Sequence, residues 1–174
     1  IVSSKFLDKM NNNLPKMIEI EPRNNRKWTK HNFRMIKELY GLYGNVNETG
    51  GNIIIDEKFK KKFKSIIHVY FDKGISCSFK ANIRQHGDFL DHIELSGGNL
   101  FQSLDVSLKT GHINGITKFK LLIPKTRNNP EDEIILTELL RYLDYLAPRT
   151  SFVKVKANNL TKKMLFQEKA EKEM

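Results

Sequence analysis

The clearest alternation of apolar and polar residues runs over 75–84. Its odd-numbered positions are apolar and its even-numbered positions are polar, and this period of two predicts a half-buried antiparallel strand. Residues 65–71 are the expected partner strand, joined to it by a tight turn at 72–74. Two further strands are predicted over 104–108 and 118–123, where apolar and polar side chains again alternate.

The N-terminal part of the chain carries one predicted helix. Residues 1–28 contain two prolines and repeated asparagines, which indicates an irregular, extended lead-in. Thr29 is expected to cap a helix that runs to about Tyr43. The apolar residues of this segment fall three and four positions apart, which predicts a buried stripe on one helix face. The stripe comprises Phe33, Ile36, Tyr40 and Tyr43.

A second helix is predicted over 130–145. Asn129 is the expected cap, Pro130 suits the first turn, and acidic residues at 131–133 complement the positive end of the helix dipole. Pro148 forbids continuation of the helix. A hairpin is expected next, with strands over 151–156 and 162–167 joined by a turn at Asn158-Asn159. The buried stripe of this helix is expected to be Leu136, Leu139, Leu140 and Leu143.

These elements predict an α+β domain, in which a mostly antiparallel sheet of about five to six strands packs against the leucine-rich helix. We expect an N-terminal extension with one helix over residues 1–57 and the sheet domain over 58–174. The single cysteine, Cys77, excludes an intrachain disulfide. No apolar run of about 18 residues is present, so no membrane span is predicted.

The chain is strongly basic, with 30 lysines and arginines against 20 acidic residues and a net charge of +10. This charge favours anionic partners, although lysines that merely solvate the surface would give the same composition. The densest basic run is 58–64, which reads either as a helical turn with a buried phenylalanine edge or as a localisation or nucleic-acid patch. The composition does not assign a compartment.

Several charged residues are candidates for phosphate chemistry. Lys118 and Lys120 are two positions apart on one predicted strand and therefore share a face. A strand lysine paired with a helix carboxylate neutralises nucleotide phosphates in kinases, and Glu133 or, second, Glu138 is the candidate partner. Arg84 closes the alternating strand, and Gly87 would allow close backbone approach to a phosphate. Ordinary exposed lysines and a strand terminus are the alternatives.

Two histidines and two aspartates lie close together just after this strand, namely His86, Asp88, Asp91 and His92. Their spacing on an expected loop matches no helical zinc motif, so it is weak evidence for a metal site.

Four segments together resemble the spore coat protein H (CotH) kinase family. They occur in the family's order along residues 65–174, and the Ala-Pro-Arg-Thr break after a leucine-rich helix is the most specific of them. The segments are Ile83-Arg84-Gln85-His86-Gly87-Asp88, Thr117-Lys118-Phe119-Lys120-Leu121, Leu146-Ala147-Pro148-Arg149-Thr150 and Phe166-Gln167-Glu168-Lys169.

This resemblance implies the small, nucleotide-binding lobe of an atypical protein kinase that transfers phosphate from ATP, with Mg²⁺, to a protein serine. It implies that Lys118 or Lys120 is the nucleotide lysine, that Glu133 is the helix glutamate, and that Glu168 lies beside the adenine pocket. The family's catalytic and metal-binding aspartates belong to a large lobe beyond these residues, so the chain alone is expected to be inactive.

The expected partners are therefore ATP and an unidentified protein substrate, and not nucleic acid. The alternative is a non-catalytic basic module that binds an acidic partner, nucleic acid included. Salt separates the two hypotheses, because binding driven by backbone phosphates weakens steeply as salt rises.

Overall fold

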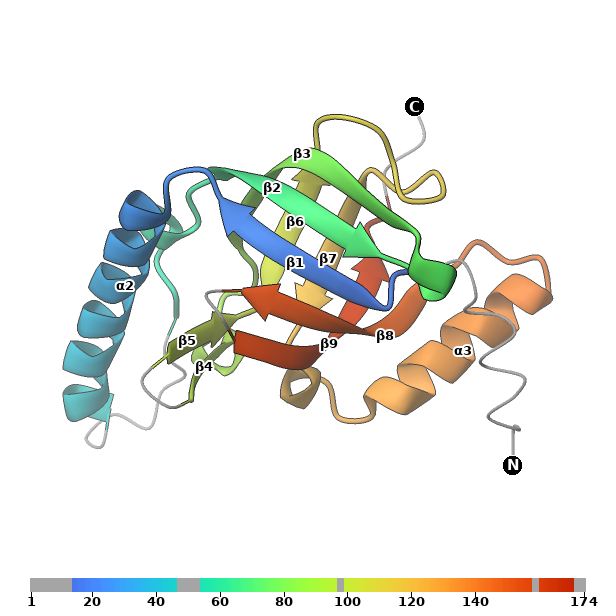
Figure 1. Cartoon of the computed structure of the whole chain (residues 1–174). Helices are drawn as coiled ribbons and strands as arrows, with labels where there is room; N and C mark the ends of the chain where they lie inside the picture. The colour runs from blue at the N-terminus through green and yellow to red at the C-terminus, as the bar shows by residue number, and fades with distance from the viewer. Residues whose placement is uncertain (1–13, 47–53, 97–98, 158–159, 171–174) are drawn as a thin grey trace.

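The computed structural model describes residues 14–46, 54–96, 99–157 and 160–170. Its centre is a closed barrel of seven strands in the order β1-β2-β3-β6-β7-β9-β8 (Figure 1). The barrel strands are β1 (Met17–Pro22), β2 (Phe63–Tyr70), β3 (Ser76–Gln85), β6 (Leu104–Leu108), β7 (Lys118–Leu122), β8 (Thr150–Ala157) and β9 (Leu160–Glu168). A two-stranded sheet and two α-helices flank it; these are β4 (Ile93–Ser96), β5 (Asn99–Gln102), α2 (Asn25–Val46) and α3 (Pro130–Tyr142).

Pairing between the first and eighth strands closes the barrel. β1 runs parallel to β8, with Met17 opposite Lys154 and Ile20 opposite Ala157, whereas every other pair in the barrel is antiparallel. The expected α+β fold, a kinase small-lobe sheet with a packed helix, is therefore wrong: the described part is mostly β, a closed barrel with two helices. The prediction failed because no local pattern reports the pairing of strands so far apart in sequence.

Apolar side chains fill the barrel. In each strand alternate residues point inward, and a barrel of this size has an interior that side chains alone can occupy. The rings of Phe119 and Phe166, both fully buried, lie with their centroids 4.7 Å apart. Ile18, Ile67 and Ile83 contribute from three neighbouring strands. The side chains that point outward from the barrel do not take part in this core and are available for binding.

The predicted hairpins are confirmed. β2 pairs with β3 and β8 pairs with β9, both antiparallel; the expected turn at Asn158-Asn159 lies outside the described residues. The buried face of 75–84 is only partly as predicted, because Ala81 and Ile83 are buried but Ile75 is 58% exposed. The reason is the short partner strand: β6 covers β3 only from Ala81 to Gln85.

The irregular lead-in expected over 1–28 is wrong for residues 17–28, which form β1 and the start of α2. The helix begins at Asn25, four residues before the predicted cap at Thr29. Asn24 caps it instead, because its Oδ1 accepts a hydrogen bond of 2.9 Å from the backbone N–H of Lys27. Residues 1–13 lie outside the described residues.

The buried face of α2 also differs from the prediction. Trp28, Met35 and Leu39 are buried, at helical spacing, whereas Phe33 is 66% exposed. Trp28 packs edge-on against Phe63, with ring centroids 5.0 Å apart. Of the predicted stripe, Phe33 is therefore misplaced and Ile36 is half-buried, while the side chains of Tyr40 and Tyr43 lie outside those that the structure describes. The prediction failed at Phe33 because the helix has apolar residues on more than one face.

α3 likewise presents an unexpected face. Its buried residues are Ile134, Thr137 and Glu138, and Ile134 packs on Leu122, Leu165 and Phe152 outside the barrel. Three of the leucines predicted to be buried, Leu136, Leu139 and Leu143, are exposed. The helix does end before Pro148, as predicted. Neither α-helix is long and apolar enough, over the residues described, to cross a membrane.

Candidate functional site

A hollow of about 290 Å³ lies on the outer face of β3, β6 and β7. Side chains two positions apart on a strand share a face. The register of the three strands therefore places the side chains around the hollow in rows that run across the strands. In one row Asp105 lies opposite both Arg84 and Lys120. In the next row Ser107 lies opposite both Asn82 and Lys118.

Among the described residues, five cationic side chains line this hollow, against one carboxylate, that of Asp105. Four of the cations are exposed lysines. Their ammonium groups stay hydrated, so placing them around the hollow carries no large desolvation cost. The lining also includes Asn82 and Ser107, which offer uncharged donors, and none of its described residues is aromatic. Such a surface favours an anion with several oxygen acceptors, such as a phosphate chain. The five cations are Lys62, Arg84, Lys109, Lys118 and Lys169.

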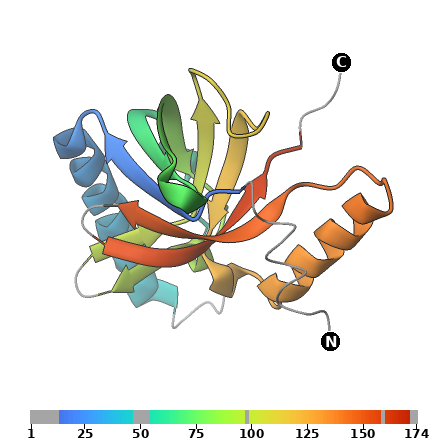
Figure 2. The same ribbon diagram turned by 45° about the vertical axis from the view of Figure 1, so that its right-hand side comes forward.

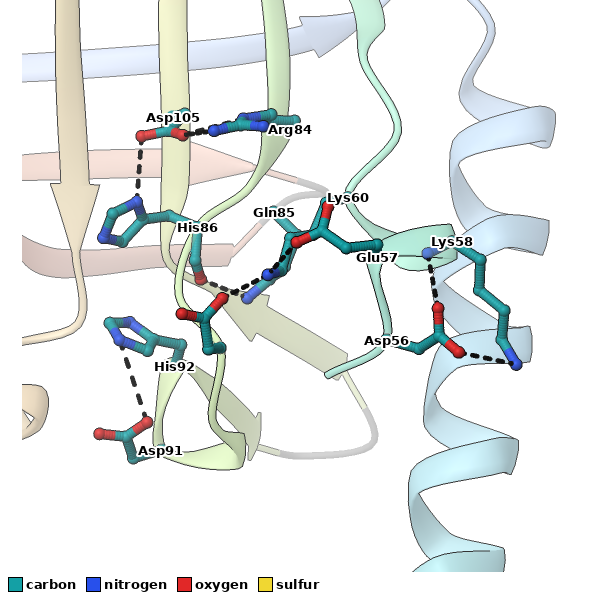
Figure 3. A network of polar contacts seen from close by, with 11 residues as sticks. Asp56, Glu57, Lys58, Lys60, Arg84, Gln85, His86, Asp91, His92 and Asp105 are labelled. Carbon is teal, nitrogen blue, oxygen red and sulfur yellow. Dashed lines mark hydrogen bonds and ion pairs between the residues drawn. The ribbon is translucent and has the colours of Figure 1, made fainter. Parts of the chain in front are cut away.

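Asp105 holds two neighbouring side chains in place at the edge of this hollow (Figure 3). Arg84 donates to its Oδ2 from Nε at 2.9 Å and lies 2.8 Å from it through Nη2. The Nδ1 atom of His86 lies 3.0 Å from Oδ1. Burial opposes ionisation of Asp105, but the hydrogen bonds with His86 and Arg84 outweigh it and lower its pKa to about 2.

Lys120 and Glu133 lie near each other but are not paired. Lys120 is half-buried and lies opposite Gln167 of β9, and Gln167 donates a hydrogen bond through Nε2 to Glu133 Oε1. Glu133 also lies 3.5 Å from Nε of Arg127. The expected ion pair between a strand lysine and Glu133 is therefore absent from the described residues.

The second candidate partner, Glu138, is also paired with another residue. It is buried and lies 3.3 Å from Nη1 of Arg141, one helical turn further along α3. Lys118 and Lys120 thus pair with neither predicted helix glutamate.

Glu168 forms a two-pronged ion pair with Arg149. The distances are 2.8 Å from Nε to Oε2 and 2.9 Å from Nη2 to Oε1, and this pairing lowers the pKa of Glu168. The backbone N–H of Arg149 donates to the same carboxylate at 3.2 Å. The pair holds the segment after Pro148 against β9, and Glu168 does not line the hollow.

The loop after β3 is built around Gly87. Its φ of +89° is strained for residues with a side chain, and an added Cβ would lie 1.9 Å from Cδ2 of His92. The His92 ring packs edge-on against His86, with centroids 5.2 Å apart (Figure 3). Burial lowers the pKa of His92. Gly87 therefore serves the packing of this loop, and it does not line the hollow.

The other charges of this loop face elsewhere. Asp88 forms an ion pair with Lys60. Lys60 also pairs with Glu57 (Figure 3). Asp91 lies 4.0 Å from Nε2 of His92. Across the described ranges, no group of three or more His, Cys, Asp or Glu side chains is arranged to hold a metal ion.

The hollow thus joins two of the five predicted binding residues, Arg84 and Lys118. Lys120 adjoins it in register, whereas Glu133 and Glu168 are held in contacts of their own. The residues that the sequence prediction missed are Lys62, Lys109, Lys169 and Asp105. Three of these are lysines in a lysine-rich chain. Lys62 lies in the basic run 58–64 and Lys169 ends one of the segments that resemble the family, but neither pattern indicates that these lysines share a site. Asp105 stands on the polar face of a predicted strand, but its position opposite Arg84 depends on strand register.

No family model matches this chain, and a search of curated proteins returned no match either. The resemblance to the spore coat protein H kinases therefore rests on the residues themselves.

Proposed function

We propose that the outer face of β3, β6 and β7 binds the phosphates of ATP, and that the chain is the nucleotide-binding part of a CotH-like protein kinase that phosphorylates a protein serine. One observation carries the proposal. Arg84 and one of the two candidate lysines, Lys118, come from separate segments of the sequence and line the same hollow. The barrel differs from the kinase small lobe that the resemblance implied, so the proposal rests on the residues of this hollow and not on the fold.

The charge distribution in the hollow supports a triphosphate more than a single phosphate. Its cations come from β3, β7, the segment before β2 and the ends of β6 and β9, so they surround an extended anion. Arg84 is held by Asp105, which fixes its guanidinium at one side of the hollow. Because none of the described lining residues is aromatic, the base gains no stacking contact from them. We therefore expect tripolyphosphate to compete with ATP.

Mg²⁺, which the family resemblance implies, finds no set of three ligands among the described residues. We place no metal on this face, and the proposal assigns these residues the binding of the phosphates.

Titration with a fluorescent ATP analogue tests the proposal. Replacing Lys109 and Lys118 together by methionine removes two hollow cations while keeping side-chain length. The affinity should fall by about tenfold, since two exposed ion pairs contribute roughly 1.4 kcal/mol together. Lys154→Met is the matched control, because Lys154 is an exposed lysine of β8 outside the hollow. Equal affinities for the three proteins would refute the assignment of the site.

A second candidate function is the binding of a longer polyanion. Its support is that exposed lysines continue beyond the hollow: Lys64 lies opposite Asn82, and Lys80 precedes Asn82 on the same face of β3. A salt titration with duplex DNA distinguishes the two functions, because the logarithmic slope is about −0.9 for each neutralised phosphate. DNA binding that depends steeply on salt and that ATP does not inhibit would favour the polyanion. Displacement of the nucleotide analogue by tripolyphosphate and not by DNA would favour the ATP site.

A further inference from the structure

α3 carries a large exposed apolar face. Six large apolar side chains of the helix and the segment after it are each 50% or more exposed. Taking about 150–250 Å² for one large side chain, their summed exposed area is roughly 700 Å², and contiguous apolar patches larger than a few hundred Å² are uncommon on a monomer. A patch of this size indicates a protein interface. The six residues are Leu136, Leu139, Tyr142, Leu143, Tyr145 and Leu146.

Acidic residues border this apolar face. Glu131 and Asp132 lie exposed at its start and Asp144 at its end. None of the three has an ion pair within the part of the chain that the structure describes. On a protein with a net charge of +10, these three carboxylates make the border of the apolar face locally negative.

α2, at the opposite end of the molecule, has a complementary face (Figures 1 and 2). Arg26, Lys30, Arg34 and Lys37 recur at helical spacing and are exposed, and over the described ranges none of them forms an ion pair. Phe33 lies among them and is 66% exposed. The one acidic residue of this helix, Glu38, pairs with Lys58.

The two faces also match in length. Arg26 to Lys37 and Glu131 to Tyr142 each span eleven helical steps, or about 16 Å. The apolar area on α3 is close to the roughly 800 Å² that each partner contributes to a stable interface.

We infer that the α3 face of one copy of this chain docks on the α2 face of a second copy. Phe33 enters the apolar stripe formed by Leu136, Leu139 and Leu143, and the α2 cations meet the acidic border. The faces lie at opposite ends of each molecule, so every bound copy keeps one face free and association proceeds head to tail into open chains.

Symmetric pairing of two α3 helices fits the charges less well. It would bring two acidic borders together, and like charges in contact oppose association. Arg141, the basic residue in the last turn of α3, already contacts Glu138 of its own helix.

Two surface variants test the inference by sedimentation velocity. Leu139→Glu alters the α3 face alone, and the double change Lys30→Glu with Arg34→Glu alters the α2 face alone. Each variant should remain monomeric at concentrations where the wild type forms oligomers, with apparent Kd weakened at least about tenfold. An equimolar mixture of the two should form a dimer and nothing larger, because each supplies the one intact face that the other lacks.

Lys154→Glu, an exposed charge reversal on β8, is the control and should associate like the wild type. Thermal melts should show that all variants remain folded, since every changed side chain is exposed. A wild-type chain that stays monomeric at about 200 µM would overturn the inference. So would a mixture that stays monomeric, or loss of association in Leu139→Glu with none in the α2 variant, which indicates symmetric α3 pairing.

Discussion

Replacing Asp105 by asparagine should destabilise the barrel by an amount that depends on pH. The carboxylate of Asp105 is 13% exposed and receives contacts from Arg84, at 2.8 and 2.9 Å, and from His86, at 3.0 Å. Asparagine keeps the size of the side chain but removes its charge. The substitution therefore tests the electrostatic contribution with little change in packing.

The pKa of Asp105 sets the size of the effect. It is lowered to about 2 from an ordinary value of 3.8, and each pKa unit corresponds to about 1.4 kcal/mol. The ionised carboxylate therefore contributes about 2 kcal/mol to the free energy of unfolding near pH 7. Because its pKa is lowered in the folded state, this contribution is present above pH 3.8 and is lost as the pH falls through about 2.

Urea unfolding followed by the fluorescence of Trp28 measures this difference. Trp28 is the single tryptophan and is buried, so its emission should report unfolding. At pH 7 we expect Asp105→Asn to lose about 2 kcal/mol, with the melting temperature lowered by roughly 4–8 °C. Asp72→Asn is the control: its carboxylate is 48% exposed and 3.4 Å from Lys16, so it should change stability by less than about 1 kcal/mol.

The comparison with the wild type at low pH is decisive. The difference between wild type and Asp105→Asn should shrink to well below about 1 kcal/mol at pH 2, where the carboxylate takes up a proton. A difference that stays constant from pH 7 to pH 2 would show that Asp105 acts through packing and not through its charge.

Two further matched pairs test the fold. Gly87→Ala should cost about 2 kcal/mol or more in a urea melt, since the new Cβ meets His92, whereas Gly41→Ala on α2 meets nothing within 4 Å and should stabilise by about 0.5–1 kcal/mol. Equal effects would contradict the assigned loop geometry. Ile83→Ala should cost about 2–5 kcal/mol and Ile75→Ala less than about 1 kcal/mol, because only Ile83 is fully buried. Similar losses would show that β3 is covered along its whole length.

Local pattern was sufficient to predict six of the seven barrel strands and their hairpin partners, but not β1 or the small sheet of β4 and β5. The alternation over 75–84 and the hairpin near the C-terminus are encoded by neighbouring residues, and the structure confirms both. β1 was missed because it is short and lies among prolines and asparagines. Its place in the sheet depends on pairing with β2 and β8, which no local pattern contains.

The candidate site was only partly predictable for a related reason. Arg84 stands out at the end of a strand, and Lys118 lies within a segment that resembles a kinase family. Their neighbours in the hollow are ordinary lysines, and Asp105 becomes their partner only through the register of β6 against β3. Residue type therefore indicated phosphate binding, and strand register determined which residues come together in one site.

The helices show most clearly what only the tertiary structure decided. The sequence by itself determined that helices form near 25–46 and 130–142 and that Pro148 interrupts the chain. It did not determine which side of each helix is buried, because both helices carry apolar residues on more than one face. Contact with the barrel buries Ile134 and leaves Leu139 exposed on one helix, and it buries Trp28 and leaves Phe33 exposed on the other. Burial depends on the surface that a helix meets, and here that surface exists only once distant strands have closed the barrel.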